Sequence, residues 1–103
     1  MRMLFKVSIP VETGNAAVKS GTLGSTIQSI LEEMKPEAAY FCEDNGQRTG
    51  FIFVDVPSES DIPRLAEPWF LAFNAGVEMH PAMTGEDLGK AGPAIEAAAK
   101  KYG

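Results

Sequence analysis

The chain has 103 residues, of which 45% are hydrophobic and 22% are charged, and its formal net charge is −5. This length and composition predict one globular domain over residues 1–103, and the acidic balance with scattered basic residues argues against nucleic-acid and anionic-membrane partners. The lone cysteine, Cys42, excludes an intramolecular disulfide and a thiolate metal cage. No stretch approaches the roughly 20 apolar residues that span a bilayer. We therefore expect a cytoplasmic protein.

The first third of the chain predicts a strand, a loop and a helix. Met3 to Ile9 alternate between apolar and mixed side chains, as in a strand with one buried face. Val11 to Gly21 contains two glycines, an asparagine and a serine, and we interpret it as an ordered loop that could include one short helical turn. Apolar residues then recur at helical spacing from Leu23 to Met34, with Thr22 as N-cap. Lys35-Pro36 ends this helix, because the residue before a proline avoids the helical region.

The middle of the chain predicts a hairpin and a second helix. Ala38 to Glu43 and Phe51 to Val56 flank the pair Asn45-Gly46, which supplies the positive φ angles of a tight hairpin turn. The helical stripe that follows has Pro63 in its first turn. We expect Pro68 to kink or break this helix, because its ring removes a backbone donor and clashes with the preceding turn.

A fourth strand and a further helix complete the chain. Val77 to Pro81 alternates as a short strand. Thr84 is followed three residues later by Asp87, a pattern typical of a helix N-terminus. Apolar residues continue at helical spacing to Tyr102, with a bend expected at Gly92-Pro93.

This order of elements predicts a ferredoxin-like β-α-β-β-α-β fold of the α+β class, with an extra C-terminal helix. Its four-stranded antiparallel sheet has both crossover helices on one face. The other face is uncovered, and an uncovered apolar face must find a partner, so we predict a homodimer formed through the open sheet face. Seven apolar side chains are expected to face the helices: Met3, Phe5, Val7, Ile9, Ile52, Val54 and Val56.

The strand residues that alternate with these seven point to the open face, and many of them are polar or aromatic. The first strand is central and the fourth lies beside it, so Lys6 could neighbour both Asp55 and the fourth strand. A base, acids and an imidazole that titrates near neutral pH would then line a cavity with aromatic walls, and His80 is the natural proton-transfer group. The candidate catalytic residues are His80, Glu78, Asp55 and Lys6, and the candidate ligand-binding residues are Phe51, Phe53, Tyr40 and Trp69.

Each assignment has a structural alternative. Charged residues on a strand face are more often solvated or paired across strands than catalytic. Trp69 belongs to a helical stripe of the kind that is more often core than ligand wall. Cys42 lies in an apolar strand, where an inert buried thiol is commoner than a nucleophile, and the inward face of that strand stays ambiguous. Glu78 and His80 share a strand face, but a catalytic zinc site needs three protein ligands, so we expect no metal site within one chain, and a shared site across a dimer interface stays open. We also expect no cofactor.

The element order and three extended segments resemble a family of small bacterial proteins within the dimeric α/β-barrel superfamily. The segments are Lys35-Pro36-Glu37-Ala38-Ala39-Tyr40-Phe41, Gly50-Phe51-Ile52-Phe53 and Glu67-Pro68-Trp69-Phe70-Leu71-Ala72-Phe73-Asn74-Ala75. The resemblance implies two sheets packed face to face around a small ligand. Members include cofactor-free monooxygenases, muconolactone-isomerase-like enzymes, haem-degrading enzymes and ligand-sensing domains, and no catalytic set carries over because the matching positions vary among them.

Some relatives in this family carry the label pantothenate synthetase. That enzyme is a much larger nucleotidyl-transferase-like protein with histidine-containing nucleotide motifs, whereas this chain has one histidine and no such motif. Haem degradation is disfavoured as well, because His80 is the only candidate axial histidine. We therefore predict a homodimer that binds a small organic molecule between sheet and helices. It is either a cofactor-free enzyme that uses the open-face residues or a non-catalytic dimerisation or ligand-sensing module.

Overall fold

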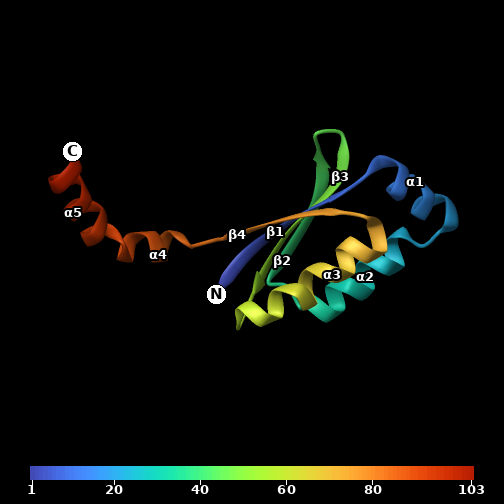
Figure 1. The fold of residues 1–103 in the computed structure, drawn as a ribbon, viewed down its shortest axis with the longest axis horizontal. Coiled ribbons are helices and arrows are strands. Elements are labelled where there is room, and N and C mark those ends of the chain that lie inside the picture. The colour runs from blue at the N-terminus through green and yellow to red at the C-terminus, as the bar shows by residue number, and fades with distance from the viewer.

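The computed structural model describes residues 1–103 as a four-stranded antiparallel sheet with five α-helices (Figure 1). The strands β1 (Arg2–Ile9), β2 (Ala38–Asp44), β3 (Gln47–Asp55) and β4 (Gly76–Pro81) lie in the order β2-β3-β1-β4. This order confirms the predicted ferredoxin-like α+β fold. The helices are α1 (Val11–Ser20), α2 (Leu23–Met34), α3 (Ile62–Phe73), α4 (Gly85–Lys90) and α5 (Gly92–Tyr102), with a short 3-10 helix, η1 (Glu59–Asp61), before α3.

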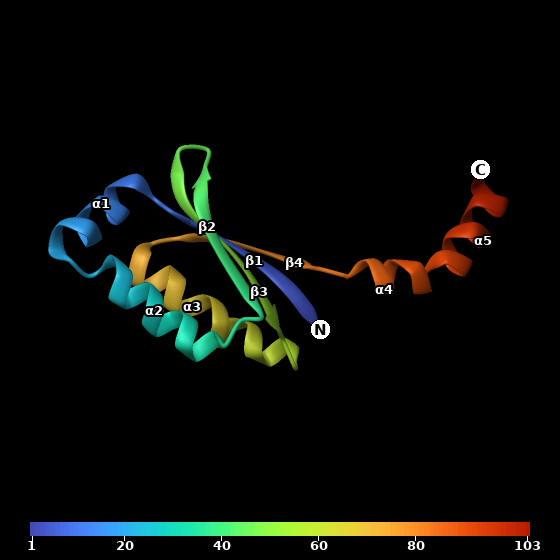
Figure 2. The same ribbon diagram turned by 180° about the vertical axis from the view of Figure 1, so that it is seen from behind.

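One face of the sheet packs against α2 and α3 and forms the core (Figures 1 and 2). The seven strand and strand-end residues expected to face the helices are all buried, with at most 6% of their surface exposed. Trp69 of α3 is fully buried, and its indole Nε1 donates to Met34 Sδ of α2 at 3.2 Å. Burying each Val, Ile, Phe or Met side chain of β1 and β3 contributes about 1.5–3 kcal/mol, so their alternation is enough to determine which face the helices cover.

The β2–β3 hairpin resolves the orientation of the second strand. Asn45 and Gly46 have φ angles of 52° and 75° and form the predicted two-residue turn. Tyr40 pairs with Phe51, and the next residue, Phe41, pairs with Gly50. Because Phe51 lies on the open face, Tyr40 shares that face and Phe41 points toward the helices.

The segment after β1 is a ten-residue helix, so its interpretation as a loop is wrong. Pro10 precedes the helix and Gly21, with φ of 74°, ends it in the left-handed conformation. Gly14 is buried inside it, because a Cβ at this position would lie 2.6 Å from Arg48 Nη1. The two glycines therefore serve close packing and helix termination rather than a loop.

Two further expectations concern helix ends. Pro68 does not end α3, which continues from Ile62 to Phe73, so the predicted break is wrong. The lost hydrogen bond is outweighed by burial of Trp69 and Phe73 beyond the proline. The expected capping pattern at Thr84 is confirmed. The helix expected to bend at Gly92-Pro93 is divided at Ala91, directly before these residues, into α4 and α5.

The last 22 residues, 82–103, form an arm that projects from the end of β4 and carries α4 and α5 (Figures 1 and 2). The molecule measures 58 × 28 × 20 Å and its radius of gyration is 17.1 Å, against about 13 Å for a compact chain of this length. None of the arm's side chains is buried. None of the helices has the length and apolar character that a bilayer crossing requires. Four large apolar side chains of the arm are at least half exposed: Met83, Leu88, Ile95 and Tyr102.

Candidate functional site

Three of the four predicted catalytic residues lie together on the open face of the sheet. Lys6 pairs with Glu78 across β1 and β4, and Lys6 Nζ is 3.8 Å from Glu78 Oε2. His80 Nε2 lies 3.5 Å from Glu78 Oε1. The Glu78 and His80 side chains are about three-fifths exposed, so these contacts are well solvated.

The closest partner of Lys6 is Asp44, which sequence reasoning did not select. Lys6 Nζ lies 2.6 Å from Asp44 Oδ2 at the end of β2. The hydrogen bond to this carboxylate, followed by its charge and that of Glu78, raises the pKa of Lys6 against the opposing effect of desolvation. Lys6 is therefore a cation held between two acids, and its arrangement is that of a cross-strand ion pair rather than of a proton-transfer base.

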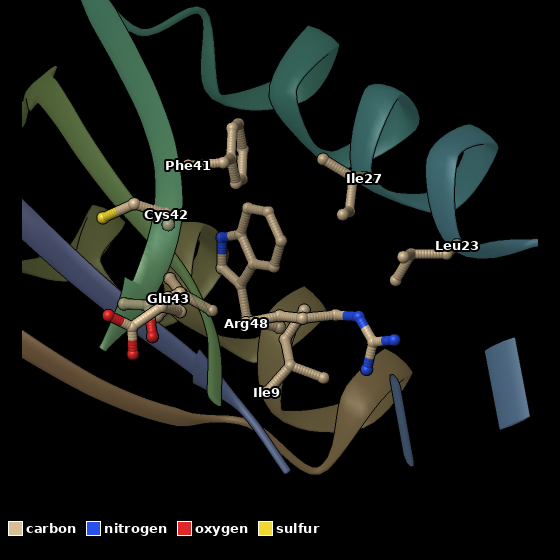
Figure 3. A pocket seen from close by; sticks show the side chains of 11 residues that line it. Ile9, Leu23, Ile27, Phe41, Cys42, Glu43 and Arg48 are labelled. Carbon is tan, nitrogen blue, oxygen red and sulfur yellow. The ribbon is translucent and has the colours of Figure 1, made fainter. Parts of the chain in front are cut away.

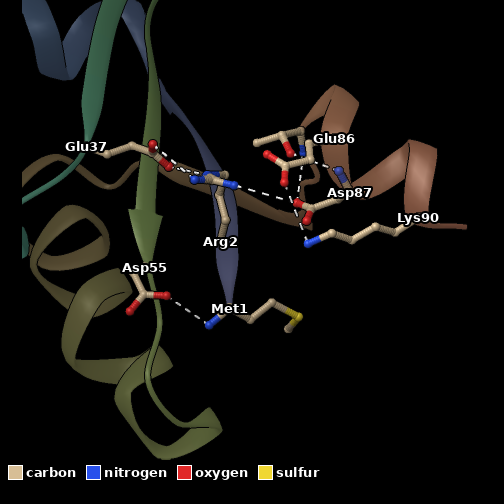
Figure 4. A network of polar contacts seen from close by, with 8 residues as sticks. Met1, Arg2, Glu37, Asp55, Glu86, Asp87 and Lys90 are labelled. Atoms are coloured by element: carbon tan, nitrogen blue, oxygen red, sulfur yellow. Dashed lines mark hydrogen bonds and ion pairs between the residues drawn. The ribbon is translucent and has the colours of Figure 1, made fainter.

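Asp55 lies away from this cluster, at the end of β3 and opposite Arg2 in the ladder. Its carboxylate accepts a hydrogen bond from the amino group of Met1 at 2.9 Å (Figure 4). Arg2 in turn pairs with Glu37 and lies 3.9 Å from Asp87 of α4. The structure therefore does not bring Asp55 together with the other predicted catalytic residues.

The predicted aromatic residues divide between the two faces of the sheet. Phe51 and Phe53 lie half-buried on the open face beside the exposed Tyr40. Trp69 lies on the helix side and is fully buried. The four aromatic residues therefore do not share one site.

A cavity of about 320 Å³ lies on the helix side, between the sheet and α2 (Figure 3). Gly50 of β3 makes room for it, since a Cβ there would lie 2.9 Å from the ring of Phe41. The absent side chain lets this ring lie close to the strand backbone. Figure 3 shows Phe41 on one side of the cavity and Leu23 and Ile27 of α2 on the other. Six large apolar side chains line it: Val7, Ile9, Leu23, Ile27, Phe41 and Trp69.

The polar lining of the cavity is confined to a few side chains. Arg48 extends between Ile9 and Leu23 (Figure 3), and its Nη1 donates to Asn15 Oδ1 of α1 at 3.1 Å. Thr49 borders the cavity through its backbone, since it pairs with Ser8 and Cys42 and so has the parity of the open face; its buried hydroxyl donates to the carbonyl of Gln47 at 3.1 Å. Such a site can hold an apolar molecule and orient one polar end of it.

Sequence reasoning selected only Trp69 among the residues that line this cavity. Gly50 gave no signal at that point, because the predicted strand began at Phe51. The structure extends β3 back to Gln47, and a glycine inside a strand often marks a close approach by another group. The buried thiol expected at Cys42 is wrong: the residue is exposed on the edge strand β2, and its sulfur points away from the cavity (Figure 3). No three His, Cys, Asp or Glu side chains gather closely enough to hold a metal ion.

Comparisons with known proteins add a structural likeness only. No protein-family model matches the chain, and no curated protein matches it. Among solved structures it is similar to a formyltetrahydrofolate deformylase from Pseudomonas putida KT2440, with 16% sequence identity and a TM-score of 0.49. The match covers 80% of this chain and 29% of that one, so this chain spans less than a third of that protein. The functional argument therefore rests on the residues of the site.

Proposed function

We propose that the protein is a homodimeric module that binds a small apolar molecule in the cavity between the sheet and α2. The cavity itself carries this proposal. Its volume of about 320 Å³ falls within the roughly 300–1,000 Å³ of ligand pockets. Its wall is mainly aliphatic and aromatic, so a ligand gains free energy by leaving water.

The position of the cavity favours binding or sensing over catalysis by the predicted acid–base cluster. Lys6, Glu78 and His80 lie on the open face, whereas the cavity lies on the helix side of the same sheet. A ligand enclosed there would be separated from His80 by the sheet. We therefore favour the non-catalytic, ligand-sensing alternative.

The unpartnered surfaces support a homodimer. The open face leaves Leu4, Phe51 and Phe53 without a covering helix. The α5 helix has only 11 residues and packs none of its side chains into a core, although isolated helices of this length are marginal in water. The open face carries both a positive charge, Lys6, and a negative charge, Glu78. In a twofold dimer the same face of each copy meets, so a face with both signs of charge can be complementary to itself.

Titration with 1-octanol tests the cavity directly. Trp69 is the single tryptophan of the chain, so its indole N–H gives one NMR signal from the cavity wall. We expect this signal to shift saturably. Ile27→Trp should weaken octanol binding in calorimetry because the larger side chain fills the cavity, whereas Gln28→Trp, at an exposed position of the same helix, should not.

Three outcomes would contradict the proposal. The first is an unchanged Trp69 signal at saturating octanol. The second is equal octanol affinity in the Ile27→Trp and Gln28→Trp variants when both are folded. Loss of octanol binding in His80→Ala with the fold retained would return the site to the open face.

A further inference from the structure

We propose that the ligand of this cavity is an apolar monocarboxylate whose carboxylate binds the guanidinium of Arg48. This inference rests on the proposed function of the cavity and specifies the chemical class of its ligand. The apolar wall favours a ligand with a hydrocarbon or aromatic part, and the arginine at the edge of the cavity favours a ligand that carries a negative charge at one end.

Arg48 stands out among the arginines because it lacks an acidic partner. The chain has three arginines: Arg2 pairs with Glu37 and Asp87, and Arg64 pairs with Asp61. No carboxylate oxygen lies within 4.0 Å of the Arg48 guanidinium. The arginine at the cavity is therefore the one without a carboxylate partner, and its side chain is exposed.

The acid nearest in register does not neutralise this charge. Glu43 pairs with Arg48 across the β2–β3 ladder and also lines the cavity. Its Oε2 instead accepts a hydrogen bond from the backbone N–H of Gly46 in the hairpin turn, at 3.2 Å. A ligand carboxylate would thus meet a cation that the protein leaves available.

The first helix holds Arg48 in place. A Cβ on Gly14 would lie 3.3 Å from Arg48 Cδ and 2.6 Å from Nη1, so the side chain lies directly against the glycine. Asn15 accepts the hydrogen bond from Nη1. A guanidinium has five N–H donors, and the single protein contact leaves enough of them to bind a carboxylate through two parallel hydrogen bonds.

The cavity volume sets the size of the ligand. At about 30 Å³ per small group, 320 Å³ holds about ten non-hydrogen atoms. Octanoate has this size, and 1-octanol has the same chain without the charge. The two compounds therefore separate the contribution of the carboxylate from that of the apolar wall.

The test is a titration of the protein and its Arg48→Gln variant with octanoate and with 1-octanol, followed by the Trp69 indole signal at pH 7. A charge-assisted hydrogen bond changes affinity about tenfold or more. We expect Arg48→Gln to weaken octanoate binding at least tenfold and to leave octanol binding unchanged. Arg64→Gln, which removes the same charge from α3, should leave both unchanged. Arg48→Lys should give an intermediate loss, because an ammonium lacks the planar pair of donors.

The outcomes separate this inference from the proposed function. Octanol binding with no preference for octanoate, or an octanoate affinity that Arg48→Gln does not alter, overturns the carboxylate assignment and leaves the apolar site standing. Absence of binding by both compounds overturns both. If Arg48→Gln does not fold, Arg48→Lys decides: octanoate affinity equal to that of the unsubstituted protein overturns the assignment.

Discussion

Phe5 and Phe53 show how the side chains of neighbouring strands divide between two surfaces. Phe5 points into the helix-covered core and is fully buried. Phe53 lies half-buried on the open face opposite Leu4. The same residue type is therefore buried in the core at one position and lies on the uncovered face at the other, where the proposed dimer contact would form.

Alanine substitutions at these two positions should have different effects. Phe5→Ala should lower the free energy of unfolding by about 3–5 kcal/mol, since it removes a large buried side chain. Phe53→Ala should cost less under conditions where the protein is monomeric and should weaken self-association. Urea unfolding and sedimentation of both variants provide the measurement. Equal losses of unfolding free energy in the monomer would contradict the assigned faces.

Side-chain parity could be predicted from the sequence, whereas the partners of individual charges could not. Strand period alone places Lys6 and Glu78 on one face and Val54 on the other. The contact between Lys6 and Asp44 spans two strands and depends on how the hairpin twists. Asp55 meets the amino group of Met1 instead, a contact that strand periodicity does not describe.

At the scale of elements, the helix ends follow local chemistry that the sequence shows. Thr84 Oγ1 accepts from the backbone N–H of Asp87 at 3.1 Å, and Asp87 Oδ2 accepts from the N–H of Thr84 at 3.1 Å. This reciprocal pair satisfies two donors at the start of α4. Gly14 inside α1 and Pro68 inside α3 are harder to predict. Both residues disfavour a helix by their intrinsic propensity, and the tertiary packing that offsets this cost cannot be deduced from the local sequence.

The start of α4 should depend on pH. The backbone N–H of Thr84, more than any other group, holds the pKa of Asp87 below its ordinary value of 3.8. A lowered pKa in the folded state means that the ionised carboxylate stabilises α4 above about pH 3.8 and that this contribution is lost as pH falls through the folded pKa. We expect the helical NMR shifts of residues 85–90 to decrease in that window. In Asp87→Asn they should be weaker at neutral pH and should lose this pH dependence. An acid transition of α4 that is identical in both proteins would contradict the account.

At the scale of the whole molecule, the arm and the open sheet face are the surfaces that the proposed second copy would cover. Ile95 is exposed on α5 and belongs to its apolar stripe, whereas Glu96 lies on the polar side. We expect the protein to sediment as a dimer, Ile95→Asp to shift it toward monomer, and Glu96→Ala to leave it dimeric. A monomeric unsubstituted protein at micromolar concentration would contradict the dimer.

The sequence predicted the architecture better than the candidate site, and the reason is physical. The hydrophobic periods of strands and helices repeat over many residues, so the order of elements and the buried face of β1 can be predicted from one sequence. The cavity instead is lined by residues of β1, β2, β3, α2 and α3. It also depends on Gly50, which has no side chain to collide with the Phe41 ring. The position of the Arg48 side chain depends on α1, because this side chain packs against Gly14 of that helix. Because a loop was expected over residues 11–21, the sequence did not predict the contacts of Arg48 with Gly14 and Asn15, on which the proposed carboxylate contact depends.

The central claim, that the cavity between the sheet and α2 is a ligand site, is tested most directly by a crystal structure of the protein grown with octanoate. We predict electron density for the alkyl chain of octanoate between Ile27 and Trp69, with the octanoate carboxylate at the Arg48 guanidinium. A cavity closed by Phe41 and Trp69 themselves, with octanoate absent or bound on the open sheet face, would contradict the account.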